Sequence, residues 1–166
     1  MKPNVLQDFE YRYKRIIKEL KETRADVMCL QEVDHYDDVY KEHLTNMGYQ
    51  CALVYRKNKD ATLIGWQKSK FTLLDQHNVH YNDIADQFGE HAKLFMRSNV
   101  ALICLLQHVK TGNKLVVAAT HLYWKLKKDF VKYAQGVYLL KNISAFLKKH
   151  KLSLDDKKLN DKSSQS

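Results

Sequence analysis

The chain has 166 residues, of which 45% are apolar and 28% are charged, a balance typical of one folded domain rather than of a disordered chain. No apolar run approaches 18 residues and the N-terminus has no apolar signal segment, so we expect neither a membrane span nor secretion. The net charge of +9 favours polyanionic partners, nucleic acid first, although a basic solubility surface explains the charge too.

Helical and strand patterns alternate in the first third of the chain. Residues 8–23 have apolar side chains at helical spacing, with Asp8 as a candidate N-cap. Residues 26–31 form a short apolar run typical of a buried strand, and residues 37–47 predict a second helix that ends before Gly48. Helix, strand and helix in so few residues indicate an α/β protein.

Strand patterns dominate after Gly48. The segment 80–98 is polar and irregular, so we expect a long functional or mobile loop there. A final helix is predicted over 128–149, and the low hydrophobicity of 151–166 predicts a disordered tail behind a single domain of residues 1–150. Strands are predicted over 49–55, 61–66, 71–79, 99–108 and 114–120, the last two joined by a hairpin turn that contains Gly112.

Three cysteines, Cys29, Cys51 and Cys104, lie far apart, each inside an apolar run. No Cys-x-x-Cys spacing indicates a zinc site. Buried, reduced thiols of an intracellular protein are the simplest interpretation, and we expect a cytoplasmic location, with the nucleus and the mitochondrion as alternatives.

Two apolar strands end in side chains that are able to carry chemistry. Glu32 follows the strand 26–31, and His121 follows the strand 114–120. If the two strands run parallel, Glu32 and His121 lie at the same sheet edge, where α/β architectures place ligands and metals. A carboxylate there suits Mg²⁺, and a histidine suits a phosphate oxygen. Taken singly, each residue is equally compatible with a structural role.

Several stretches resemble the endonuclease/exonuclease/phosphatase superfamily, specifically its deadenylase branch of carbon-catabolite-repressor-type deadenylases, nocturnin and the Angel proteins. The two strand ends carry the resemblance first, as Leu-Gln-Glu-Val-Asp at 30–34 and Ala-Thr-His-Leu at 119–122. Shorter matches follow in the family's order over roughly residues 8–148, at 10–12, 59–60, 99–102 and 132–135, with Ala61 in place of the family's glycine after Asp60.

The resemblance implies a four-layer α/β sandwich with two mixed sheets that face each other. It also implies a Mg²⁺-dependent phosphodiesterase of the 3′-5′ exoribonuclease or poly(A) deadenylase type, with Mn²⁺ as an alternative cofactor and the 3′ poly(A) end of RNA as partner. By the same resemblance, Glu32 is the metal-binding and catalytic carboxylate and His121 the second catalytic group. Substrate-binding residues are expected at Asp60, Asn99, Tyr123, Lys125 and Gln135.

The family pattern is incomplete in this chain. The opening Tyr-Asn strand, the later Gly-Asp-Phe-Asn motif and the terminal Ser-Asp-His motif are absent, so the chain resembles roughly the first half of the domain. We therefore expect a truncated, weakly active or inactive form whose open sheet edges need a protein partner. Two alternatives remain: a non-catalytic RNA-binding protein, or a phosphodiesterase or phosphatase of the same superfamily that acts on DNA, a phosphoinositide or a nucleotide.

Overall fold

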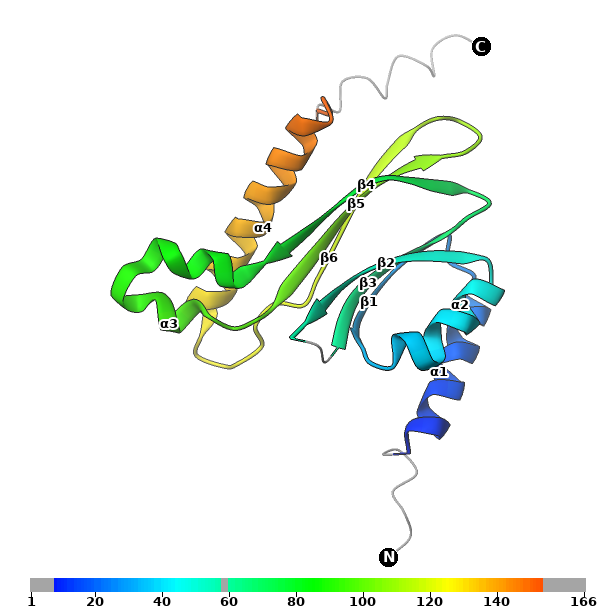
Figure 1. The fold of residues 1–166 in the computed structure, drawn as a ribbon, viewed down its shortest axis with the longest axis horizontal. Helices are drawn as coiled ribbons and strands as arrows, with labels where there is room; N and C mark the ends of the chain where they lie inside the picture. Colours follow the sequence, from blue (N-terminus) through cyan, green and yellow to red (C-terminus); the bar gives the residue numbers. More distant parts are fainter. Residues whose placement is uncertain (1–7, 58–59, 154–166) are drawn as a thin grey trace, which may run out of the picture.

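The computed structural model of the chain describes residues 8–57 and 60–153 (Figure 1). Its elements follow in the order α1 (Phe9–Thr23), β1 (Val27–Val33), a π-helical turn η2 (Tyr36–Tyr40), α2 (Lys41–Asn46), β2 (Tyr49–Arg56), β3 (Asp60–Gln67), β4 (Phe71–His80), a 3₁₀-helical segment η3 (Tyr81–His91), α3 (Ala92–Phe95), β5 (Val100–His108), β6 (Lys114–Thr120) and α4 (Asp129–Lys149).

The strands form two three-stranded sheets, with the orders β1-β3-β2 and β4-β5-β6. The helices α1 and α2 cover the outer face of the first sheet, and α4 covers the outer face of the second (Figure 1). The expected four-layer α/β sandwich is therefore confirmed. Every pairing among the described strands is antiparallel, so the mixed sheets that we expected do not occur there. A tight turn at Gly112 joins β5 to β6, and only three residues separate β2 from β3; such short connections permit only antiparallel neighbours.

Three apolar clusters hold the layers together. The central cluster lies between the sheets and joins Ile64 and Trp66 of β3 to Leu102 and Leu106 of β5. A second cluster lies between the first sheet and its helices, and a third lies between the second sheet, η3 and α4. Because β3 and β5 are central strands with a cluster on each face, their side chains are almost all buried.

The predicted helix ends agree with the structure. The Asp8 side chain accepts a hydrogen bond from the Glu10 backbone N–H at 2.9 Å, which satisfies a free donor at the start of α1. Gly48 has φ +86°, a conformation that favours glycine, in the turn that follows α2. The predicted final helix is confirmed as α4.

The segment 80–98 is mostly helical, so the prediction of an irregular loop was wrong. Tyr81, Ile84, Ala85 and Phe88 stand at helical spacing, and the first three are buried. Gly89, at φ +47°, interrupts the helical geometry before α3 begins. The many polar residues of this segment obscured its apolar stripe.

The expectation of three buried thiols was also wrong, because Cys29 is exposed, Cys51 is half-buried and only Cys104 is buried. Cys29 lies on β1, which pairs with β3 on one side only.

Within the described residues no helix is long and apolar enough to cross a membrane. The predicted disordered tail lies almost wholly outside the described residues.

Candidate functional site

Glu32 projects from an irregularity in β1. Leu30 pairs with Leu63 and Val33 pairs with Ala61, so β1 contains one residue more than β3 between these pairs. Glu32 lies in this bulge with φ +54°, a left-handed conformation that costs a non-glycine residue free energy. Its side chain is 64% exposed. The buried strand expected here is an edge strand in which only Met28 and Val33 are buried. A strained, exposed acid near the end of such a strand is typical of a functional residue rather than a packing residue.

His121 directly follows β6, whose last residue, Thr120, pairs with Ala101 of β5. The Thr120 hydroxyl donates a hydrogen bond to the Val100 carbonyl at 3.1 Å and contacts the hydroxyl of the buried Tyr81 at 2.9 Å. These contacts hold the end of β6 in place. The position of His121 is therefore determined by the second sheet and by the start of η3.

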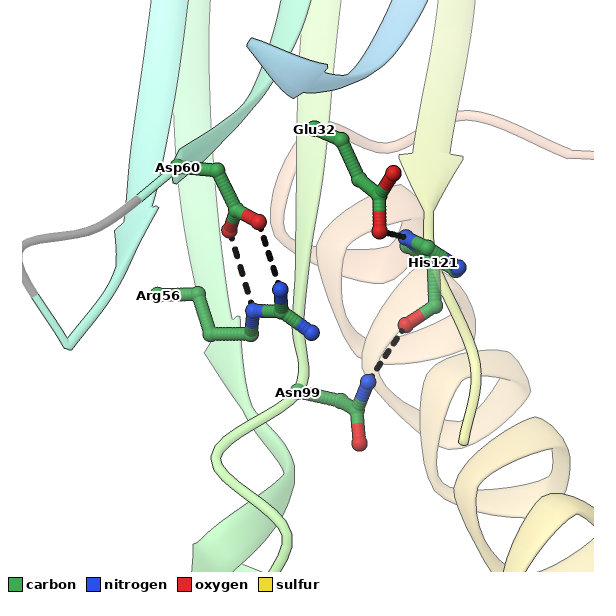
Figure 2. A network of polar contacts seen from close by, with 5 residues as sticks. All are labelled: Glu32, Arg56, Asp60, Asn99 and His121. Atoms are coloured by element: carbon green, nitrogen blue, oxygen red, sulfur yellow. Dashed lines mark hydrogen bonds and ion pairs between the residues drawn. The ribbon is translucent and has the colours of Figure 1, made fainter. Parts of the chain in front are cut away.

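The two predicted catalytic side chains meet across the sandwich. His121 Nδ1 lies 3.8 Å from Glu32 Oε1 (Figure 2). We expected Glu32 and His121 to share one sheet edge if their strands ran parallel. They do not, because β1 and β6 belong to different sheets. The two sheets face each other, and so the ends of β1 and β6 converge without any hydrogen bond between the strands.

A groove of ≈ 820 Å³ lies beside Glu32, between α1 and the end of β1. Its lining includes the acids Glu32, Asp34 and Asp60 together with Arg12 and Arg15 of α1. Carboxylates and guanidinium groups in one groove suit a metal ion and a phosphate group. The two arginines were not among the predicted site residues, since helical spacing accounts for them as the solvent face of α1.

Asp60 is already paired. Its carboxylate accepts hydrogen bonds from Arg56, from Nε to Oδ1 at 2.9 Å and from Nη2 to Oδ2 at 2.5 Å (Figure 2). Arg56 and Asp60 are also cross-strand neighbours at the end of the β2–β3 hairpin. The pair closes this hairpin beside the groove, and substrate binding by Asp60 stays a prediction.

Asn99 and Gln135 are buried, at 2% and 1% exposure, and bind the protein's own backbone. Asn99 Nδ2 donates to the His121 carbonyl at 2.9 Å, and Gln135 Oε1 accepts from the Tyr123 backbone N–H at 2.8 Å. Gln135 Nε2 also donates to Asn99 Oδ1 at 3.3 Å. These hydrogen bonds hold the backbone on both sides of Leu122 in place, and substrate binding by Asn99 and Gln135 stays a prediction.

Tyr123 and Lys125 continue the chain from His121, with Tyr123 half-buried and Lys125 exposed. The Arg97 guanidinium carbon lies 5.1 Å from the centre of the Tyr123 ring. Arg97 Nε is buried without a hydrogen-bond partner in the described part of the chain. Arg97 was not among the predicted site residues, although it lies only two residues before Asn99, which was.

The donor set fits a hard cation only in part. Among the described residues no three histidine, cysteine, aspartate or glutamate side chains cluster as a ligand set. Mg²⁺ is commonly held by one or two carboxylates together with water and substrate phosphates, and the exposed Glu32 carboxylate meets that minimum.

The sequence model of the Endonuclease/Exonuclease/phosphatase family matches residues 4–133. The chain belongs to this family. Among curated proteins, it is 38% identical over 150 residues to protein angel homolog 2 of Danio rerio, covering 86% of this chain and 25% of that protein. It is 29% identical over 168 residues to the CCR4-Not complex 3′-5′-exoribonuclease subunit Ccr4 of Neurospora crassa, covering 89% of this chain and 21% of that protein.

Solved structures of the family have the same fold. ANGEL2, described as a 2′,3′-cyclic phosphatase in complex with adenosine-2′,3′-vanadate, matches with a TM-score of 0.74 and 34% identity over 84% of this chain and 40% of that one. The human nocturnin catalytic domain with bound sulfate matches with a TM-score of 0.75 at 24% identity, over 87% and 54%. The chain thus spans about a quarter of the curated relatives and about half or less of these two structures.

Proposed function

We propose that this chain carries the Glu32–His121 part of a metal-dependent phosphodiesterase site that acts on the 3′ end of RNA, as a 3′-5′ exoribonuclease of the poly(A) deadenylase type. The observation that carries the proposal is the 3.8 Å approach of His121 Nδ1 to Glu32 Oε1 at the mouth of a groove that contains two arginines. The Ccr4 exoribonucleases among the relatives support RNA as the substrate.

Each residue has a role in this proposal. Glu32 holds Mg²⁺, or Mn²⁺, which when bound supplies a Lewis acid for a phosphoryl oxygen. His121 donates a hydrogen bond to a phosphate oxygen and stabilises the charge that develops on it. Arg12 and Arg15 attract the RNA backbone. Asn99 and Gln135 keep the backbone carbonyl of His121 and the backbone N–H of Tyr123 in place.

Glu32 and His121 supply one carboxylate and one imidazole, whereas hydrolysis also needs a base that activates water. We therefore propose that this chain by itself hydrolyses RNA weakly or not at all. Full turnover then depends on groups from a further segment or partner that reach the groove at the open edges of β1 and β6.

The test compares Glu32→Gln with Glu19→Gln, which removes an exposed carboxylate of α1 outside the groove. The substrate is a labelled oligoadenylate with Mg²⁺, and products are resolved by length. Loss of metal-dependent shortening in Glu32→Gln, with Glu19→Gln unaffected, supports the proposal. Measurable shortening at equal rates in the two variants contradicts it. If the unmodified chain hydrolyses nothing, RNA binding that neither Mg²⁺ nor Glu32→Gln changes identifies the non-catalytic alternative.

A second candidate is a phosphatase acting on 2′,3′-cyclic phosphates at RNA ends. The ANGEL2 structure, at 34% identity, supports it because that protein is described as a 2′,3′-cyclic phosphatase. The same groove serves both reactions, since each places one phosphodiester at the end of an RNA strand. An oligoadenylate that carries a 2′,3′-cyclic phosphate distinguishes them: opening of the cyclic phosphate without shortening identifies the phosphatase.

A further inference from the structure

A second, aromatic pocket lies between η3, α3 and the first half of α4, and it shares no lining residue with the groove beside Glu32. Its volume is ≈ 350 Å³. Its lining includes the aromatic residues Phe88, Phe95, Phe130 and Tyr133 and the basic residue Lys141. Neither the hydrolytic site nor the central core uses these side chains.

The aromatic rings form a stacking platform. Phe88 and Phe95 are parallel, with centroids 3.7 Å apart and an interplanar angle of 13°. Phe130 meets Phe95 edge-on at 5.8 Å. Phe95 is buried, whereas Phe88, Phe130 and Tyr133 are 36%, 42% and 76% exposed. The buried Phe95 supports two exposed rings, and the exposed Tyr133 lines the same pocket, so a further flat ring is able to stack on this surface.

The charge around this pocket matches a polyanion. Residues 125–141 contain five lysines and a single acid, Asp129, which forms an ion pair with Lys132 at 2.6 Å. Lys128 Nζ lies 5.4 Å from the Phe130 centroid, and Lys141 lines the pocket. The acids Asp83, Asp86 and Glu90 belong to η3 on the opposite wall. A bound polyanion must therefore follow α4 rather than η3.

The pocket and the hydrolytic site are joined by α4. Tyr133, Ala134 and Tyr138 of α4 line the pocket, while Gln135 of the same helix holds the backbone N–H of Tyr123, two residues from His121. A strand of nucleic acid that ends at His121 is thus able to continue along the start of α4.

We propose that the pocket of Phe88, Phe95, Phe130 and Tyr133 binds nucleobases of single-stranded RNA upstream of the end held at Glu32 and His121. Bases stack on the exposed rings, and Lys128 and Lys141 contact the phosphates. Aromatic side chains beside lysines are the usual means by which proteins hold single strands without reading their sequence. The choice of RNA, and of the direction of the strand, rests on the proposed function.

The test measures binding without hydrolysis. Fluorescence anisotropy with a labelled 12-nucleotide oligoadenylate in EDTA gives Kd for the full chain and for Tyr133→Ala, Phe130→Ala, Tyr133→Phe and Leu140→Ala. Leu140 is an exposed apolar residue of α4 outside the pocket, so it is the matched control. We expect Tyr133→Ala and Phe130→Ala each to weaken binding by about tenfold, since one base stack contributes roughly that factor. Tyr133→Phe and Leu140→Ala should bind like the unmodified chain.

A second probe, an abasic phosphodiester of the same length, separates stacking from charge. The unmodified chain should bind it at least about tenfold more weakly than the oligoadenylate, and Tyr133→Ala should narrow this difference by about tenfold because one stack is already lost. Lys141→Gln should lower the slope of log Kd against log salt by about 0.7, the value for one phosphate of a single strand. Circular dichroism melts confirm that each variant is folded.

The proposal is overturned if Tyr133→Ala and Phe130→Ala bind RNA as Leu140→Ala does, or if the unmodified chain binds both probes equally. Failure of the proposed function gives a different result: Glu32→Gln then leaves hydrolysis unchanged while Tyr133→Ala still weakens binding. If an apolar protein segment occupies the pocket instead, the aromatic substitutions should leave the RNA affinity unchanged. This result would also overturn the proposal.

Discussion

His121 Nδ1 and Glu32 Oε1 lie 3.8 Å apart although their strands belong to different sheets (Figure 2). The contact therefore exists only when the two sheets are packed against each other. A variant that folds each sheet but loosens the central cluster would separate the two groups. The site is therefore a property of the assembled sandwich.

The left-handed backbone of Glu32 predicts a conflict between stability and function. Glu32→Gly should raise the free energy of unfolding relative to Glu32→Ala by up to about 1 kcal/mol, because glycine adopts positive φ without strain. Both variants lack the carboxylate and should lose metal-dependent activity equally. Urea unfolding of the two variants checks the first statement. Equal stability would mean that the bulge relaxes when the side chain is removed.

Substitution within the buried pair of Asn99 and Gln135 should lower the free energy of unfolding more than an ordinary surface substitution does. Gln135→Leu leaves Asn99 Oδ1 and the Tyr123 N–H without their partner and should destabilise the fold by about 1–3 kcal/mol. The exposed change Gln50→Leu is the control and should stay within about 0.5 kcal/mol. Hydrogen exchange tests the positioning role: the Tyr123 amide should exchange faster in Gln135→Leu, while the amides of β5 keep their protection.

Asp75 predicts a pH-dependent attachment of α4. Lys149 Nζ and His150 Nε2 donate to Asp75 Oδ2 at 2.6 and 2.8 Å, and these bonds lower the pKa of Asp75 to about 2. Because the folded pKa lies below the ordinary value, the stabilisation is present above pH 4 and is lost as pH falls toward 2. Asp75→Asn should cost about 1 kcal/mol at pH 7. The difference from the unmodified chain should shrink below pH 4, and a constant difference down to pH 2 would contradict this.

The cysteines predict one reactive thiol in the folded chain. Cys29 is exposed, and burial of part of its thiol raises its pKa, so its reaction with a disulfide reagent should be slow at pH 7 and faster at higher pH. Burial also raises the pKa of Cys51 to about 11 and that of Cys104 to about 12. These two thiols should react only on unfolding. Cys29→Ser identifies the reactive thiol, since this variant should lose the native-state reaction.

The same reagent tests whether a partner covers the open side of the sandwich. Cys29 lies on β1, which has no strand neighbour on its outer side among the described residues. An added segment or partner that pairs with β1 should protect Cys29, as should self-association at high protein concentration. Unchanged reactivity in the presence of a partner that restores activity would place that partner elsewhere.

Local sequence patterns were sufficient for most elements. The apolar run before Glu32, the helix over 128–149 and the turn at Gly48 all follow from short-range periodicity and backbone preference, and the structure agrees with them. The segment 80–98 was predicted wrongly, yet Tyr81, Ile84, Ala85 and Phe88 carry a helical signal that a count of apolar spacing would have found.

The sequence by itself determined that Glu32 and His121 lie at the ends of two strands, because strand periodicity and its polar boundary are local properties. Only the tertiary structure decided how they meet: across two facing antiparallel sheets, not along one parallel edge. The bulge that places Glu32 in a left-handed conformation, the burial of Asn99 and Gln135 and the exposure of Cys29 were decided in the same way. Each depends on which strand or helix lies opposite, and that choice is set by contacts between residues far apart in the chain.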